Sequence, residues 1–130
     1  MDSGMTKGLL FEQGTYRIRG AAFDVYRKMG PGFLEAVYQE CLGIEMTRRQ
    51  IPFEPQRSIR LEYDGEPLRQ GYVADFLCYG SILVELKAAR LIAAEHRAQI
   101  FNYLRATGIR VGLLINFGSS PRIQLERFAL

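Results

Sequence analysis

The sequence predicts one α/β domain in which two helices come first, followed by three strands, a third helix and two further strands. Three observations support this order. Apolar residues recur at spacings of three and four between Tyr16 and about Arg49, alternate with polar residues in the middle of the chain, and form a short continuous run near the C-terminus. The 130 residues, 48% of them hydrophobic, can bury a core without disulfides or metal ions.

The composition favours a cytoplasmic protein with no membrane partner. Cys41 and Cys78 are the only cysteines, so neither a disulfide framework nor a multi-cysteine zinc site is expected. The first residues lack the charged and apolar regions expected of a signal peptide, and the apolar runs are far shorter than the roughly 20 residues that cross a bilayer. The net charge of +3 indicates a polyanionic partner only weakly. The sequence leaves the oligomeric state open.

Two helices are expected at the start of the chain. Residues 1–13 show no usable period and are expected to form a poorly ordered lead-in. From Tyr16 to Met29 the apolar positions follow a helical period, and the sequence Gly-Pro-Gly at 30–32 ends that helix. A second helical pattern runs from about 34 to 49. The glycines read as a tight joint between helices, because the lysine and hydroxyl residue of a phosphate-binding loop are missing.

The pattern then changes to that of strands. Apolar and polar residues alternate over 58–63, and Asp64-Gly65 is a strong hairpin signal. Two further apolar runs follow before residue 88, separated by a turn that contains Gly80 and Ser81. These runs predict three strands in succession.

The last third of the chain predicts one helix and two strands. The helix covers about 92–107 and ends at Gly108, a residue typical of helix C-termini. The run "VGLLINF", residues 111–117, is typical of a strand covered on both faces. The segment "PRIQLERFAL", residues 121–130, alternates loosely and predicts an edge strand.

The stretch "GYVADFLCYGSILVELKAA", residues 71–89, carries charges inside strands that should be buried. Asp75 lies in the first strand, and Glu85 and Lys87 lie in the second. Glu85 and Lys87 are two residues apart, so their side chains leave the strand on the same face. Charges in this position need a chemical reason.

The length of the hairpin turn decides whether Asp75 joins these two residues. If residues 79–81 form a three-residue turn, Cys78 opposes Ile82 and Asp75 opposes Glu85 on one face. A two-residue turn would direct Asp75 away from them. We expect the three-residue turn or a bulge of equal parity.

Two facing carboxylates destabilise each other unless a cation lies between them. Magnesium takes oxygen ligands and commonly binds through one or two carboxylates and phosphate oxygens. An ammonium on the same face, from Lys87, would reach a water or a scissile phosphate. The residues alone leave two alternatives open, namely a structural ion pair of Lys87 with either carboxylate and a strand end that emerges into solvent.

The pattern D-x9-E-x-K, formed by Asp75, Glu85 and Lys87, resembles the core of the PD-(D/E)xK nuclease superfamily. The stretch "GFLEAVY", residues 32–38, resembles the GxxExxY family within that superfamily. The similarity continues through "IPFEPQ", "GYVADF", "VELKA", "HRAQIFNYLRATG" and "VGLLINFG". It implies a restriction-endonuclease-like core, a mixed sheet flanked by helices, and cleavage of DNA or RNA with Mg²⁺ or Mn²⁺.

The resemblance also implies roles for single residues. Asp75 and Glu85 are expected to bind the metal together with the backbone carbonyl of Leu86. Lys87 is expected to orient or activate the attacking water. Glu35 matches the acidic residue that the preceding helix contributes to many such sites, although an ordinary exposed helix glutamate would look the same.

Residues on the two neighbouring helices complete the predicted site. Gln99 and Tyr103 match a Q-x-x-x-Y pattern of related nucleases, and Gln99 is expected in the catalytic set. Tyr103, His96 and Tyr38 are expected to contact the substrate or a site residue, with simple packing as the alternative for each. Family members often carry a histidine where this sequence has Tyr26, so that histidine's role does not transfer.

The sequence therefore predicts a metal-dependent nuclease. The alternative is a non-catalytic nucleic-acid-binding or protein-interaction module on the same fold. Neither DNA nor RNA is favoured, and neither endonuclease nor exonuclease action.

Overall fold

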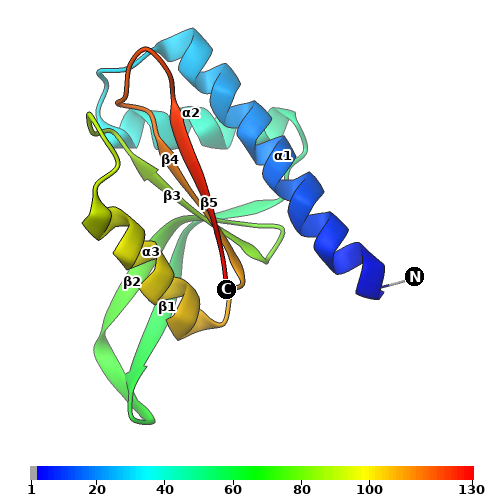
Figure 1. Ribbon diagram of the computed structural model, residues 1–130, viewed down its shortest axis with the longest axis vertical. Helices are drawn as coiled ribbons and strands as arrows, with labels where there is room; N and C mark the ends of the chain where they lie inside the picture. The colour runs from blue at the N-terminus through cyan, green and yellow to red at the C-terminus, as the bar shows by residue number, and fades with distance from the viewer. Residues whose placement is uncertain (1–2) are drawn as a thin grey trace.

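The computed structural model describes residues 3–130 and has the predicted order of elements, ααβββαββ (Figure 1). Its helices are α1 (Ser3–Met29), α2 (Glu35–Arg48) and α3 (Ala94–Thr107). Its strands are β1 (Phe53–Tyr63), β2 (Glu66–Cys78), β3 (Ile82–Lys87), β4 (Val111–Asn116) and β5 (Gln124–Ala129). No described helix has a segment long and apolar enough to cross a bilayer.

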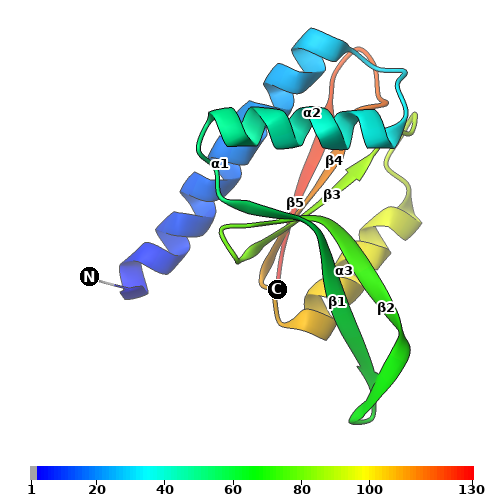
Figure 2. The same ribbon diagram turned by 180° about the vertical axis from the view of Figure 1, so that it is seen from behind.

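The five strands form one mixed sheet in the order β1-β2-β3-β4-β5. Strands β3 and β4 are parallel, and the other neighbours are antiparallel. Figures 1 and 2 show α3 on the opposite side of the sheet from α1 and α2, and the hairpin of β1 and β2 extending beyond the sheet. The last strand, β5, is an edge strand as predicted.

The start of α1 differs from the sequence prediction. The helix begins at Ser3, so the expected start at Tyr16 is wrong and the expected lead-in is helical from Ser3 onward. Phe11 packs against the core, and a Cβ added at the buried Gly14 would lie 2.9 Å from Cδ1 of Ile82. Because glycine has no side chain, a core-facing glycine does not count as an apolar position, and the helical period was lost there. Residues 1 and 2 lie outside the described residues.

The sheet has a hydrophobic core on each face. One core joins α1 and α2 to the even-numbered side chains of β3, and it contains Ile18, Leu42, Val84 and Leu86. The other joins α3 to the opposite face, and it contains Leu83, Ile100, Leu104 and Leu114. Fully burying one such side chain stabilises the fold by roughly 1.5–3 kcal/mol. Strands β3 and β4 are therefore covered on both faces, which explains their continuous apolar sequence.

The joint between α1 and α2 is held by Tyr38. Gly30 and Gly32 adopt φ values of 72° and 109°, which glycine tolerates and other residues rarely adopt. The fully buried Tyr38 donates its hydroxyl hydrogen to Gly30 O and accepts a hydrogen bond from Phe33 N at 3.2 Å. Its ring stacks on Phe117 with 4.7 Å between centroids. The expected contact of Tyr38 with a substrate is therefore wrong, because neither ring nor hydroxyl reaches the surface.

Asn116 holds the chain that follows β3. Its fully buried amide group accepts a hydrogen bond from Ala89 N at 2.9 Å and donates one to Ala89 O at 2.8 Å. Gly118 lies against the same backbone, since an added Cβ would be 2.5 Å from Ala89 O. The segment that leaves Lys87 is thereby fixed against the end of β4.

Gly118→Ala is expected to destabilise the protein by about 2 kcal/mol or more, because the new methyl group would overlap backbone atoms that cannot move aside easily. Urea denaturation measures the change. Gly43→Ala is the matched control, since it lies in α2 and its nearest neighbour would be 3.9 Å from the new Cβ. That variant should gain up to about 1 kcal/mol from helix propensity. Equal stability of Gly118→Ala and wild type would contradict the close approach.

Candidate active site

The turn between β2 and β3 has the predicted length and sets the predicted register. Tyr79 and Gly80 adopt positive φ values of 56° and 64°. Three residue pairs form the ladder: Phe76–Val84, Leu77–Leu83 and Cys78–Ile82. The next position in this register puts Asp75 opposite Glu85. The three-residue turn is confirmed, and with it the parity on which the site depends.

The two carboxylates bind backbone amides where the ladder stops. The Oδ2 atom of Asp75 accepts a hydrogen bond of 2.8 Å from Leu86 N, and Glu85 Oε2 accepts a longer one of 3.4 Å from Asp75 N. The Asp75 side chain thus replaces a backbone partner of β3. Because the N–H and C=O groups of one strand residue point to the same side, the Leu86 carbonyl also faces β2.

Burial raises the pKa of both carboxylic acids. The pKa of Glu85 is raised to about 8, mainly by burial and also by the charge of Glu35, against the opposing effects of the Asp75 amide and Lys87. Burial likewise raises the pKa of Asp75, and the Leu86 amide and Lys87 act in the opposite direction. Ionising both groups therefore costs free energy when no cation is present.

Glu35 and Lys87 belong to the same electrostatic cluster. Partial desolvation raises the pKa of Glu35, the Lys87 charge lowers it, the Asp75 charge raises it and His96 lowers it. Glu35 is the first residue of α2, so it approaches from the helix joint that Tyr38 holds. Strands β2 and β3 and the start of α2 therefore contribute to one cluster of charges.

Tyr72 connects this cluster to α3, and it was not predicted. Its hydroxyl donates a hydrogen bond to Glu85 Oε2, and its ring stacks on Tyr103 with 3.3 Å between centroids. Gln99 Nε2 lies 3.4 Å from the Tyr103 hydroxyl, to which it donates. Gln99 and Tyr103 are thus linked to Glu85 through Tyr72.

Strict alternation along β2 could not have found Tyr72. Ala74 packs in the core on the α3 side, whereas Phe76, two residues later, packs in the core on the opposite side. The alternation of side chains between the two faces of the sheet is therefore interrupted at Asp75, where Gln56 of the paired strand has a φ of 51°. A sequence pattern contains no clear signal for such a change.

His96 is committed to the start of α3. Its Nδ1 atom accepts a hydrogen bond of 3.0 Å from Ala93 N and caps the first turn. In the neutral imidazole the proton is then on Nε2, which stays available as a donor. The role of His96 as a phosphate contact stays a prediction.

The site offers few protein ligands for a metal ion. Among the described side chains, no three of the His, Cys, Asp and Glu type lie together in a way that could hold a metal ion. The cluster instead combines the carboxylates of Asp75 and Glu85 with the backbone carbonyl of Leu86. This set fits a cation that keeps several waters, as magnesium does, better than one enclosed by protein ligands.

Comparisons with known proteins identify the family and support the fold. Residues 12–128 match the sequence family described as the PD-(D/E)XK nuclease superfamily. The crystal structure of a protein named SSO0001 has a similar fold, with a TM-score of 0.58 and 19% sequence identity over 72% of this chain. The match covers 48% of that protein, so the chain spans about half of its length. None of the curated proteins matches this sequence.

The raised pKa of Glu85 predicts that the metal-free protein loses stability as pH rises. The folded protein holds this proton more tightly than the unfolded chain, so the stabilisation is complete below about pH 4.5 and is lost as pH approaches about 8. Glu85→Gln cannot ionise, and it should make the free energy of unfolding less dependent on pH across this interval. Urea denaturation in chelator at several pH values measures this.

Glu66→Gln is the control, because Glu66 is exposed at the far end of β2. Its pH dependence should match that of the wild type. If Glu85→Gln also matches the wild type, the buried carboxyl group does not titrate as its surroundings indicate.

Proposed function

Because the chain belongs to the PD-(D/E)XK nuclease superfamily, we propose that it is a metal-dependent nuclease that hydrolyses phosphodiester bonds of DNA or RNA. The observation that carries the proposal is the register of β2 and β3. In this register Asp75 lies beside Glu85, and Lys87 follows Glu85 two residues later in β3. Two partly buried carboxylates and a nearby ammonium would form a site suited to phosphoryl chemistry.

A divalent cation, Mg²⁺ or Mn²⁺, is the proposed cofactor. Asp75, Glu85 and the Leu86 carbonyl would hold it. The chemistry of these donors supports the assignment, because burial raises the pKa of both acids and no described ion pair neutralises either one. When bound, the cation would supply positive charge for the phosphate oxygens and acidify an attacking water.

The remaining residues would orient the reacting groups. Lys87 would orient the water and offset negative charge on the phosphate as the bond breaks. Glu35 is exposed towards solvent, and partial burial raises its pKa, so its carboxylate would be a stronger proton acceptor than an ordinary glutamate. Tyr72, supported by the Tyr103 ring, would hold Glu85 in one orientation through its hydroxyl group.

Within the superfamily we assign the chain to the GxxExxY family on residues 32–38. The three motif positions have separate physical roles in this protein. Gly32 provides the φ of 109° at the joint, Glu35 begins α2 at the charged cluster, and Tyr38 holds the joint from inside the core. The three motif residues would thus direct the start of α2, with Glu35, towards the site.

Asp75→Asn tests the metal site. It should weaken Mn²⁺ binding at least tenfold in isothermal titration calorimetry, because one carboxylate charge is lost. The metal-free protein should be as stable as the wild type or up to about 1 kcal/mol more stable, since charge repulsion is relieved and the amide oxygen still accepts from Leu86 N.

Asp64→Asn is the matched control for this experiment. Asp64 lies at the β1–β2 turn with a φ of 51°, which asparagine also adopts readily. It should leave Mn²⁺ binding unchanged. Clear destabilisation of metal-free Asp75→Asn would instead indicate that Asp75 serves a structural ion pair.

Lys87→Met separates catalysis from binding. Methionine keeps much of the apolar stem, so the strand should survive. Single-turnover cleavage should fall at least about a hundredfold, as expected for the loss of a positioned charged group, whereas nucleic-acid affinity should change little. Lys28→Met on α1 is the control and should cleave at the wild-type rate. If wild-type protein binds nucleic acid but cleaves none with Mg²⁺ or Mn²⁺, the fold serves as a binding module.

A further inference from the structure

A groove on the outer side of α1 lies away from the carboxylate cluster. It has a volume of about 740 Å³ and is lined by Tyr16, Arg17, Arg19, Gly20, Phe23 and Arg49. We call it the α1 groove. Arg17 donates a hydrogen bond to the Tyr79 hydroxyl, at the turn where β3 begins, whereas Lys87 ends the same strand. The six residues of β3 separate the two places by roughly 17 Å.

Two exposed aromatic rings border the groove. Tyr16 is 77% exposed and Phe23 is 47% exposed. Positions 16, 20 and 23 share one face of a helix, so Gly20 forms the floor between the rings. The two positions lie seven residues apart, or roughly 10 Å along the helix axis. Two adjacent bases stacked between the two rings would make three stacking intervals of about 3.4 Å each, which matches this spacing.

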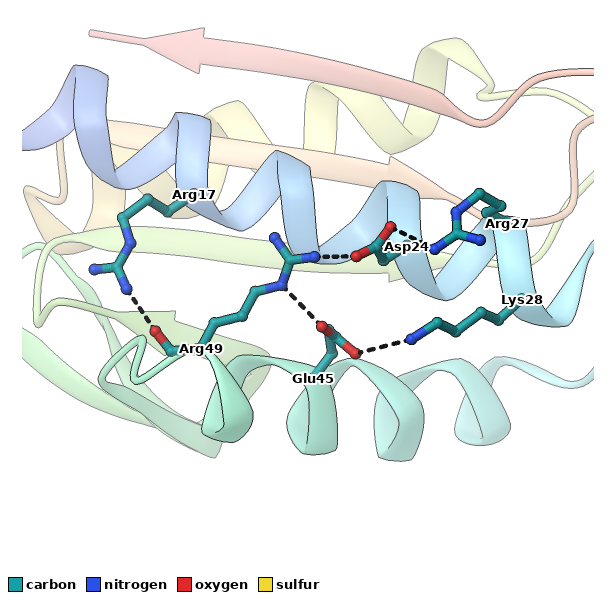
Figure 3. Close-up of polar contacts among 6 residues, drawn as sticks. All are labelled: Arg17, Asp24, Arg27, Lys28, Glu45 and Arg49. Atoms are coloured by element: carbon teal, nitrogen blue, oxygen red, sulfur yellow. Dashed lines mark hydrogen bonds and ion pairs between the residues drawn. The ribbon is translucent and has the colours of Figure 1, made fainter.

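Salt bridges and hydrogen bonds hold two of the groove's arginines, Arg17 and Arg49 (Figure 3). Arg49 forms ion pairs with Asp24 and, at 2.8 Å, with Glu45. Arg17 donates to the backbone carbonyl oxygen of Arg49 at 2.5 Å, in addition to its bond with Tyr79 at 2.9 Å. Guanidinium groups that are already fixed lose less conformational entropy when a phosphate binds.

The charge around the groove is positive in excess. Two acidic side chains, Asp24 and Glu45, are shared by Arg27, Lys28 and Arg49. Arg17 and Arg19 have no acidic partner among the described side chains. An apolar protein partner would bury these two charges without compensation, which is costly. A ligand that brings its own negative charge avoids this cost.

We propose that the α1 groove binds single-stranded nucleic acid. Two neighbouring bases stack on Tyr16 and Phe23, and the phosphates of the strand accept hydrogen bonds from Arg17 and Arg19. Aromatic side chains in a positively charged groove are the usual means of binding unpaired strands. A duplex does not fit, because its base faces are already stacked inside the helix. The groove would hold a strand independently of the cleavage chemistry at Lys87.

Fluorescence anisotropy with labelled 12-nucleotide strands tests the proposal. Measurements in chelator prevent metal-dependent cleavage, so the result does not depend on nuclease activity. Wild-type protein should bind single-stranded DNA or RNA more tightly than a blunt duplex of the same sequence. The two single strands, compared with each other, show whether the ribose hydroxyl contributes.

Variants of the groove identify the contacts. Tyr16→Ser and Phe23→Ser should each weaken single-strand binding about tenfold, the loss expected from one base stack. Arg19→Gln should reduce the dependence of log affinity on log salt by about 0.7, the loss expected from one phosphate contact. Gly20→Leu should block the groove while keeping both rings, and it provides a second test if an aromatic variant does not fold.

Tyr63→Ser is the matched control, because Tyr63 is 73% exposed at the end of β1. It should change affinity less than twofold. Folded Tyr16→Ser and Phe23→Ser proteins that bind like the wild type would overturn the proposal, and so would tighter binding of the duplex. Sedimentation of a wild-type dimer that Tyr16→Ser dissociates would also overturn it and assign the face to a second copy of the chain.

Discussion

The hydrogen bond from the Leu86 amide to the Asp75 carboxylate is the interaction on which the site depends. It ends the ladder between β2 and β3, directs the Leu86 carbonyl towards β2, and keeps Asp75 beside Glu85. A hydrogen bond to a carboxylate typically contributes about 1.5–3 kcal/mol. That gain opposes the cost of partly burying two acids side by side, so the fold tolerates a charge arrangement that it would otherwise avoid.

The two faces of the sheet serve this arrangement differently. On one face, Tyr38 and Phe117 fix the joint that brings Glu35 to the cluster. On the other, the stack of Tyr72 on Tyr103 supplies a hydroxyl group to Glu85. Asn116 and Gly118 fix the chain beyond Lys87. The groups of the cluster are held by rigid neighbours, as a site that must stabilise developing charge requires.

The sequence predicted the order of elements, the turn of residues 79–81 and the register in which Cys78 opposes Ile82, because each follows from local periodicity and turn length. It could not predict what depends on tertiary contact. Gly14 faces the core but does not count as an apolar position, so the helical period of the first half of α1 could not be recognised. The sequence alone does not show whether the Tyr38 hydroxyl forms its hydrogen bond with a loop carbonyl or with a substrate. Tyr72 faces Glu85 only because β2 changes its facing at Asp75.

The hairpin turn connects the carboxylate cluster with the α1 groove. Its length fixes the register that brings Asp75 to Glu85, and its Tyr79 contacts α1 in two places. The Tyr79 hydroxyl accepts from Arg17, and its ring lies against the Cβ position of Gly14. A change in turn length would therefore alter the parity of the carboxylates and also remove the hydrogen-bond partner that fixes one guanidinium group of the groove. Residues 79–81 therefore determine the register of the carboxylates at one end of β3 and the contact with Arg17 at the other.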